Sequence, residues 1–154
     1  MREQIELGID REWPSMLYAH SKRVLVCGSR TFLRKHVELA VPELELMPEN
    51  TVIVHGGQGR RNASGEIISG ADLLVGELAE RMGFEVEVWP ADWAGEGKIA
   101  GFKRNTRMLK SGIELVLAFW DGISNGTKDT MTKARVMGIP VRVIEFDPPW
   151  RVLQ

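Results

Sequence analysis

One stretch decides the fold of this chain: Leu115-Val116-Leu117-Ala118-Phe119-Trp120, followed by Asp121-Gly122-Ile123-Ser124-Asn125-Gly126-Thr127. The apolar run has the length of a strand buried on both faces of a parallel sheet. The glycines then allow a tight turn, and a helix is predicted from about Thr127 to Met137. Free N–H groups and the dipole at the start of that helix favour an anion such as phosphate. The residues predicted to hold it are Asp121, Gly122, Ser124, Gly126 and Thr127, although a capped helix with a glycine-rich lead-in would explain the same pattern.

The composition is that of an ordinary globular domain. The chain has 154 residues, 44% of them apolar and 27% charged, with a net charge of -1. One domain with its own core is expected, and the near-neutral charge makes nucleic acid an unlikely partner. Because Cys27 is the only cysteine, we expect no intrachain disulfide and no cysteine metal site, as in the reducing cytosol. We predict a cytoplasmic protein without a signal peptide or a membrane span, since no segment approaches about 20 apolar residues.

Strands and helices alternate along the rest of the chain. Further strands are predicted at 23–27, 51–55, 84–89 and 141–146, and helices at about 32–46, 70–82 and 99–110. This alternation implies right-handed crossovers and helices on both faces of the sheet. The predicted class is α/β, a Rossmann-like three-layer sandwich with a mainly parallel sheet of about five strands in the order 3-2-1-4-5.

The predicted Rossmann-like domain covers residues 23–147. Residues 1–22 form an N-terminal extension, which we expect to pack through Trp13, Leu17 or Tyr18, to join a partner subunit, or to remain a partly disordered arm. Residues 58–69 form an irregular polar insertion, either a mobile lid or an interaction loop. Residues 148–154 form a short C-terminal tail.

The predicted strand order brings several turns to one edge of the sheet, where open α/β sheets bind ligands. The glycines would let backbone approach a ligand, and the cations would neutralise a phosphate. The remaining predicted ligand residues are Gly28, Ser29, Arg30, Gly56, Gly57, Gly70, Asp72, Lys98, Arg104 and Asn105. Solvated surface charges and, for Asp72, a helix cap are the alternative interpretations. We interpret His55 as a structural histidine and Cys27 as a buried small hydrophobe.

Several separated motifs then follow one another in the order of a known family. They are Val24-Leu25-Val26-Cys27-Gly28-Ser29-Arg30-Thr31-Phe32, Val54-His55-Gly56-Gly57, Gly70-Ala71-Asp72, Pro90-Ala91-Asp92-Trp93, Gly97-Lys98-Ile99-Ala100-Gly101, Arg104-Asn105 with Met108-Leu109, and Ala118-Phe119-Trp120-Asp121-Gly122 through Gly126-Thr127. From Arg23 to Ile144 the chain resembles the YspA-type SLOG family, whose members are Rossmann-like and related to the LOG cytokinin-activating enzymes and to DprA. The resemblance implies recognition of a nucleotide or a nucleotide-derived ligand. Dimers are common among such proteins, so a homodimer or higher oligomer is expected.

Two departures from the family pattern bear on function. The family usually runs from the paired glycines almost directly into Gly-Ala-Asp, whereas this chain inserts residues 58–69. The LOG enzymes carry a glutamate where Thr130 stands here, so the carboxylate that would stabilise an oxocarbenium-like centre is missing. We therefore expect ligand binding or sensing, with no cofactor and catalytic residues unknown. The alternative is a LOG-like nucleoside monophosphate phosphoribohydrolase that uses Asp72, Asp121 or Asp129. A third possibility, single-stranded DNA binding, is disfavoured by the net charge and by the scarcity of aromatic residues beside basic ones.

Overall fold

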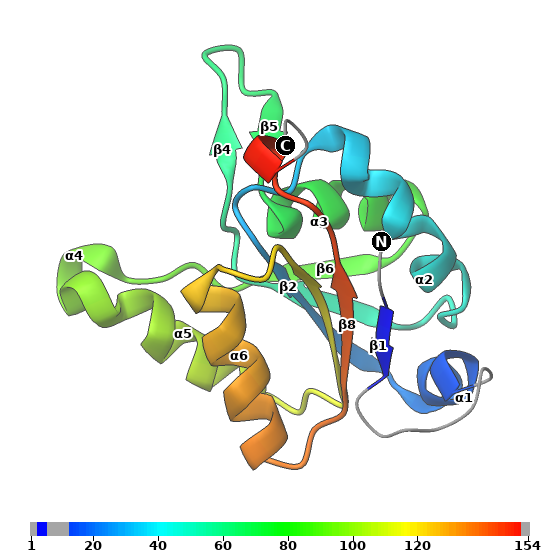
Figure 1. Ribbon diagram of the computed structural model, residues 1–154. Coiled ribbons are helices and arrows are strands. Elements are labelled where there is room, and N and C mark those ends of the chain that lie inside the picture. Colours follow the sequence, from blue (N-terminus) through cyan, green and yellow to red (C-terminus); the bar gives the residue numbers. More distant parts are fainter. Residues whose placement is uncertain (1–2, 6–12, 152–154) are drawn as a thin grey trace.

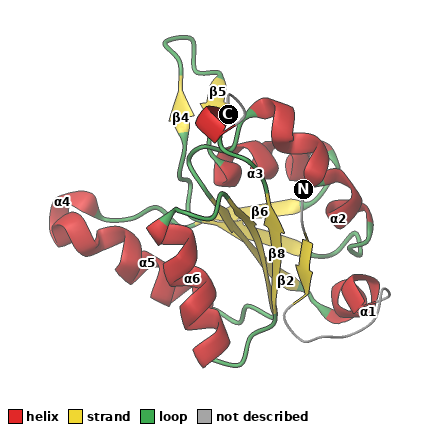
Figure 2. Cartoon of the chain, in the orientation of Figure 1, coloured by secondary structure: helices red, strands yellow, loops and turns green. Residues whose placement is uncertain are grey.

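A computed structural model describes residues 3–5 and 13–151 as an α/β sandwich (Figures 1 and 2). Its central sheet has the order β6-β3-β2-β7-β8-β1. The strands are β6 (Glu85–Val88), β3 (Val52–His55), β2 (Arg23–Gly28), β7 (Leu115–Trp120), β8 (Val141–Glu145) and β1 (Glu3–Ile5). The first five are mutually parallel and follow the predicted order 3-2-1-4-5. The sheet differs from the prediction at one edge, where β1 pairs antiparallel with β8.

The strands alternate their side chains between two hydrophobic cores, one on each face of the sheet. In β7, Leu115, Leu117 and Phe119 face one core, whereas Val116 and Ala118 face the other. The first core is covered by α1 (Trp13–His20), α2 (Val41–Glu45) and α3 (Ala71–Arg81), and the second by α5 (Ala100–Leu109) and α6 (Asn125–Val136) (Figure 1). All five of those β7 side chains are fully buried, as the continuous apolar run indicated.

One predicted helix and one predicted loop were wrong in detail. The helix predicted over 32–46 is divided into the 3-10 helix η1 (Arg34–Leu39) and α2, which has Pro42 in its first turn. Proline has no N–H to donate to the preceding turn, so it suits a helix start but not a helix interior. The loop predicted before residue 99 contains α4 (Trp93–Glu96) and η2 (Gly97–Ile99).

Helix α6 begins at Asn125, two residues before the predicted start. Ser124 occupies its N-cap position, with the extended φ and ψ angles of −57° and 122°. Asn125, Gly126 and Thr127 therefore form the first turn of α6, where backbone N–H groups have no partner within the helix.

The insertion at 58–69 is not irregular. It contains a hairpin of β4 (Arg60–Arg61) and β5 (Ile67–Ser69) that protrudes from the sandwich (Figure 1). The Asn62 side chain accepts hydrogen bonds from the Ser64 and Glu66 amides and closes the turn. Ile67 is buried in the first core, so the hairpin is anchored at its base.

The N-terminal extension packs on the domain through Tyr18, one of the three residues suggested from the sequence. Tyr18 is fully buried, and its hydroxyl donates to Glu43 Oε1 at 2.7 Å. Glu43 in turn pairs with Arg142 of β8 inside the protein. Leu17 packs partly buried against the same core, and the side chain of Trp13 lies outside the described residues.

No helix in the described ranges 3–5 and 13–151 is both long and apolar enough to cross a bilayer. The last described element after β8 is the 3-10 helix η3 (Pro149–Arg151).

Candidate functional site

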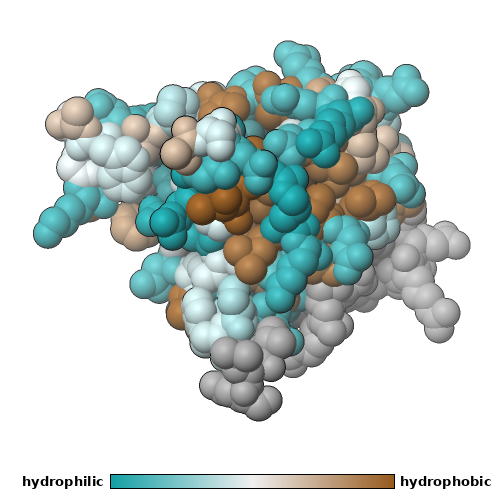
Figure 3. Space-filling view, turned by 90° about the horizontal axis from the view of Figure 1, so that it is seen from above, coloured by the Kyte–Doolittle hydropathy of each residue, from teal (hydrophilic) through white to brown (hydrophobic). Residues whose placement is uncertain are grey.

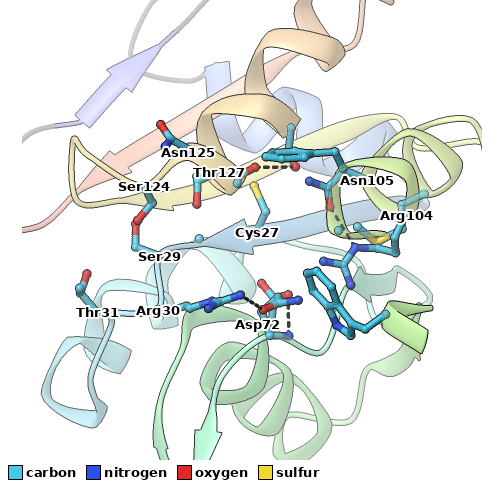
Figure 4. A pocket seen from close by; sticks show the side chains of 18 of the residues that line it. Cys27, Ser29, Arg30, Thr31, Asp72, Arg104, Asn105, Ser124, Asn125 and Thr127 are labelled. Carbon is cyan, nitrogen blue, oxygen red and sulfur yellow. Dashed lines mark hydrogen bonds between the residues drawn. The ribbon is translucent and has the colours of Figure 1, made fainter. Parts of the chain in front are cut away.

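A cavity of about 360 Å³ opens at the carboxyl end of β2, where the strand order changes direction between β3 and β7. Figure 4 shows Ser124, Asn125 and Thr127 on one side, Arg30 and Asp72 opposite them, and Arg104 and Asn105 at one end. Seen from above, the surface of the molecule carries apolar and hydrophilic residues side by side (Figure 3). The cavity is lined by Cys27, Gly28, Ser29, Arg30, Thr31, Gln58, Asp72, Trp93, Lys98, Gly101, Phe102, Arg104, Asn105, Met108, Ser124, Asn125, Gly126, Thr127 and Thr130.

The structure brings most of the predicted ligand residues to this cavity. Those that line it are Gly28, Ser29, Arg30, Asp72, Lys98, Arg104, Asn105, Ser124, Gly126 and Thr127. Those that do not line it are Gly56, Gly57, Gly70, Asp121 and Gly122. Of the second group, Gly56 and Gly57 line a neighbouring cavity.

The first turn of α6 presents unused backbone donors to the cavity. The Lys128 amide donates to Ser124 O at 3.2 Å, whereas the N–H groups of Asn125, Gly126 and Thr127 pair with no described residue. The Thr127 side chain is 4% exposed, and its hydroxyl has no partner among residues 3–5 and 13–151. Three amides and a hydroxyl at the positive end of a helix form a plausible anion site.

Asp121 holds this turn together from outside the cavity. Its Oδ1 accepts from the Ile123 and Ser124 amides at 2.9 Å each, and its Oδ2 accepts from the Thr31 hydroxyl at 2.8 Å. Burial alone would raise the pKa of Asp121, but these donors outweigh it and the pKa lies below its usual value. In the structure Asp121 orders this turn and does not line the cavity, and Gly122, with a φ of 83°, lets the turn form.

Ser29 and Gly28 join this turn to the end of β2. Ser29 Oγ accepts from the Asp121 amide at 3.0 Å, and its O–H proton can still donate to a ligand. A methyl group added at Gly28 would lie 2.4 Å from Ala71 Cβ and 2.6 Å from Phe119 O. Gly28 therefore lets α3 and β7 approach β2 closely, a packing need that the sequence alone did not separate from ligand contact.

Arg104 lies at the end of the cavity as a buried cation that is 4% exposed. Its Nη1 donates to Gly56 O at 2.6 Å and to Trp89 O at 3.0 Å, and its Nε donates to Asn105 Oδ1 at 3.0 Å. Nη2 has no hydrogen-bond partner in the described part of the chain. Burial lowers the pKa of Arg104, although the nearby Asp72 raises it. Nε and Nη1 of Arg104 therefore hold neighbouring segments of the protein together, and only the Nη2 group can donate to a ligand in the cavity.

Asp72 is the only carboxylate among the described residues that line the cavity. It is 5% exposed, and its Oδ2 accepts from the Gly56 and Gln58 amides at 3.1 Å each. Burial raises the pKa of Asp72 to about 6, against the lowering effect of those amides and of Arg104. Its Oδ1 accepts no hydrogen bond from the described residues, so it can serve a ligand hydroxyl.

The two exposed cations of the cavity come from different elements. Arg30 follows β2 and donates from Nη2 to Gln58 Oε1 at 2.9 Å. Lys98 lies in η2 and forms no ion pair with any residue in 3–5 or 13–151. Together with Arg104 they give three cations against one carboxylate, which suits an anionic ligand.

Asp129 does not line the cavity. Its Oδ2 accepts from Asn105 Nδ2 at 3.2 Å and pairs with Lys133 Nζ at 3.0 Å. Thr130 lines the cavity, and its hydroxyl donates to Gly126 O at 3.3 Å. No cluster of His, Cys, Asp and Glu suited to a metal ion occurs among the described residues.

Nine lining residues were not predicted from the sequence, because their positions fit an ordinary helix, strand or loop. Gly101, Arg104 and Met108 recur at spacings of three and four in α5, and this face could have indicated Met108. Nothing in the local pattern marked Gln58, which reaches the cavity from the base of the hairpin. The other missed residues are Cys27, Thr31, Trp93, Phe102, Asn125 and Thr130.

Fold and cavity together define a Rossmann-like α/β protein with a ligand-sized cavity at its switch point. No protein-family model matches the chain. The chain is 37% identical over 127 residues to the Gene 61 protein of Mycobacterium phage D29, and the match covers 78% of this chain and 94% of that protein. The chain therefore belongs to the family of that phage protein. The name of the relative states no activity, so a function has to be argued from the cavity itself.

Proposed function

We propose that this protein binds a nucleotide or nucleotide-derived ligand in the cavity at the end of β2, as its resemblance to the YspA-type SLOG family suggests. One observation carries the proposal. The amides of Asn125, Gly126 and Thr127, which have no partner within 3–5 and 13–151, belong to residues that line the same cavity as the cations Arg30 and Lys98. A phosphate between them would satisfy the helix start and neutralise both side chains.

The rest of the cavity suits the nucleoside part of such a ligand. Cys27, Phe102 and Met108 supply an apolar wall for a base, and Asp72 Oδ1 supplies an acceptor for a ribose hydroxyl. Burial raises the pKa of the Cys27 thiol well above its usual value, so this side chain acts as a small apolar group. Apolar walls with a few fixed polar groups are the usual make-up of small-molecule sites.

The substitution Asn125→Pro tests the phosphate site with little disturbance of the fold. Asn125 is the first helical residue, where proline is tolerated, and Ser124 already has the extended backbone that a following proline requires. The variant loses one amide donor, so binding of nucleoside monophosphates should weaken by about tenfold, the equivalent of one charge-assisted hydrogen bond. Isothermal titration calorimetry with the four common nucleoside monophosphates measures this.

Asn125→Ala is the matched control, because it removes the same side chain but keeps the N–H group. We expect it to bind within about twofold of wild type. Equal affinities of the proline and alanine variants would exclude a phosphate at this turn. Absence of binding by the wild-type protein, to these nucleotides and to small molecules released from freshly purified protein, would refute the proposal itself.

The two exposed cations give a second test. The double variant Arg30→Ala, Lys98→Ala should lose a copurified or added nucleotide, whereas Lys110→Ala, a charge removal that does not touch the cavity, should retain it. Arg104 is unsuitable for this purpose, because its loss would also free the Gly56 and Trp89 carbonyls. Mass spectrometry of the denatured variants compares their small-molecule content.

Hydrolysis of the N-glycosidic bond is the alternative function, and the position of Asp72 is the observation that favours it. Of the three aspartates considered for that reaction, Asp72 alone lines the cavity, and its pKa of about 6 suits proton transfer near neutral pH. Release of free base from a nucleoside monophosphate, abolished in Asp72→Asn, would support catalysis. Binding without release supports a sensor.

We also propose a cytoplasmic protein that assembles as a homodimer or higher oligomer. Val136 is 83% exposed on α6, and Ile99 is 51% exposed beside α5, so apolar surface is available for a second copy. Light scattering during size-exclusion chromatography measures the mass of the assembly.

A further inference from the structure

A second cavity, of about 480 Å³, adjoins the first and shares Gln58 and Trp93 with it. It lies between the hairpin, α3 and the end of β6. Its lining consists of His55, Gly56, Gly57, Gln58, Arg61, Ile67, Leu73, Gly76, Glu77, Glu80, Val88, Pro90, Ala91 and Trp93. A ligand that fills the first cavity can therefore extend past Gln58 and Trp93 into the second.

His55 gives the second cavity a hydrogen-bond donor of known position. The side chain is 4% exposed, and its Nδ1 accepts from the Gly57 amide at 2.9 Å. Because Nδ1 accepts, the proton of the neutral ring is on Nε2. Burial, with a contribution from the charge of Arg104, lowers the pKa of His55 to about 4, so the ring is neutral near pH 7. Nε2 has no hydrogen-bond partner in 3–5 or 13–151.

Helix α3 passes close to Nε2 of His55, and both His55 and Gly76 line the second cavity. A methyl group at position 76 would lie 2.6 Å from Nε2, so glycine leaves the room that the ring needs. Glycine in the middle of a helix costs about 1 kcal/mol relative to alanine, so this room is kept at the expense of helix stability.

The other walls combine apolar surface with hydrogen-bonding groups. Leu73, Val88 and Trp93 provide the apolar part, and Trp93 is 48% exposed. The Glu80 carboxylate forms no ion pair within the described ranges, whereas Glu77 is paired with Arg34 and Arg81. A sugar has the matching chemistry, because it carries hydroxyl donors and acceptors at its edge and an apolar C–H face that packs on an aromatic ring.

We propose that the second cavity binds a neutral, polyhydroxylated group joined through phosphate to the nucleotide in the first cavity, and that His55 Nε2–H donates to one of its oxygens. The ligand class is then that of nucleotide sugars. This inference rests on the proposed nucleotide-binding function of the first cavity.

The tautomer of His55 is the first test. Long-range proton–nitrogen correlation spectra of the nitrogen-15-labelled full chain distinguish the two neutral tautomers, and His55→Asn assigns the signal among only three histidines. We expect a neutral ring with the proton on Nε2 at about pH 7. A proton on Nδ1 would overturn the inference, because no donor would then face the second cavity.

Binding of paired ligands is the second test. The probes are the nucleoside diphosphates of adenine, guanine, cytosine and uracil and their glucose conjugates, compared by calorimetry. At least one conjugate should bind about tenfold more tightly than its parent diphosphate.

In His55→Asn this advantage should vanish while diphosphate affinity stays unchanged, since asparagine keeps an acceptor for the Gly57 amide but has no group at the Nε2 position. In His55→Gln, whose amide nitrogen can reach that position, part of the advantage should return. Gly76→Ala, whose methyl group would displace the ring and with it Nε2, should behave like His55→Asn.

The outcomes separate the two proposals. Conjugates that bind no better than diphosphates, or an advantage that survives in both His55→Asn and Gly76→Ala, would overturn the sugar subsite and leave nucleotide binding intact. A protein that binds neither the diphosphates nor the conjugates refutes the proposed function, and the subsite is refuted with it.

Discussion

A methyl group at Gly56 would lie 2.5 Å from the guanidinium of Arg104, whereas one at Gly126 would meet no atom within 4 Å. Both glycines were expected to contact the ligand, but their surroundings predict opposite effects on stability. Gly56→Ala should lower the free energy of unfolding by about 1–3 kcal/mol, because the displaced Arg104 loses its bonds to Gly56 O and Trp89 O. Gly126→Ala should raise it by up to about 1 kcal/mol, since alanine is the better helix residue. Urea denaturation of both variants checks this, and similar losses in the two would contradict it.

The buried carboxyl group of Asp72 should make stability depend on pH. Its pKa is about 6 in the folded protein against its ordinary value of 3.8, so the folded state binds the proton more tightly than the unfolded state. Tighter proton binding by Asp72 stabilises the folded protein by about 3 kcal/mol. This stabilisation is complete below about pH 4 and is lost as the pH rises through the pKa of the folded state.

Asp72→Asn removes this titration while keeping an acceptor for the Gly56 and Gln58 amides. The free energy of unfolding of wild type, minus that of the variant, should therefore fall between about pH 4 and pH 7. Urea denaturation over that range measures the difference. A difference that stays flat would show that the folded pKa of Asp72 is close to its usual value.

At the scale of elements, α1 and α2 are fastened to β8 by a buried polar cluster of Tyr18, Glu43 and Arg142. Glu43 and Arg142 are 4% and 3% exposed in their side chains. Removing one partner of a buried ion pair leaves the other charge without compensation from it, which costs far more than breaking a surface pair.

Glu43→Ala should therefore destabilise the protein by about 3 kcal/mol, and Tyr18→Phe by about 1 kcal/mol, since only one hydrogen bond is lost. The control is Glu77→Ala, whose pairs with Arg34 and Arg81 are half exposed and should contribute less than about 1 kcal/mol. Thermal and urea denaturation give the ranking. A Glu77 variant as unstable as the Glu43 variant would contradict this account of the cluster.

At the scale of the whole molecule, the hairpin is an insertion whose two ends meet. A methyl group built on Gly70 would lie 2.5 Å from the Cα of Gly59, and Gly70 has a φ of 108° that favours glycine. The sandwich can therefore close without the hairpin if Gly59 is joined directly to Gly70.

Deletion of residues 60–69 should leave a folded protein that is less stable by about 2–3 kcal/mol, because buried Ile67 is lost from the first core. The deletion also removes Arg61 and Ile67 from the second cavity but leaves every residue that lines the first. Circular dichroism and calorimetry should find native secondary structure, unchanged binding of a nucleoside diphosphate, and no added affinity for its glucose conjugate. Loss of diphosphate binding would show that the hairpin also supports the first cavity.

The amino-acid sequence by itself determined the layers and the strand order. Apolar runs such as Leu115–Trp120 and the alternation of strands with helices leave few topologies, because crossovers are right-handed and buried strands need cover on both faces. It also predicted that fifteen residues gather at one edge of the sheet, and ten of them line one cavity there.

Only the tertiary structure decided what each of those residues contacts. At Gly28, Gly56 and Gly70, atoms of other residues leave no room for a side chain. Asp121 accepts from three donors of its own turn and from the distant Thr31 hydroxyl. The anchoring of the hairpin through Ile67, the β1 edge strand and the Tyr18–Glu43 contact likewise depend on partners far away in the chain. Local sequence patterns indicate backbone conformation and burial. The role of a residue at a site depends on its distances to other elements, and these are fixed only when the layers pack.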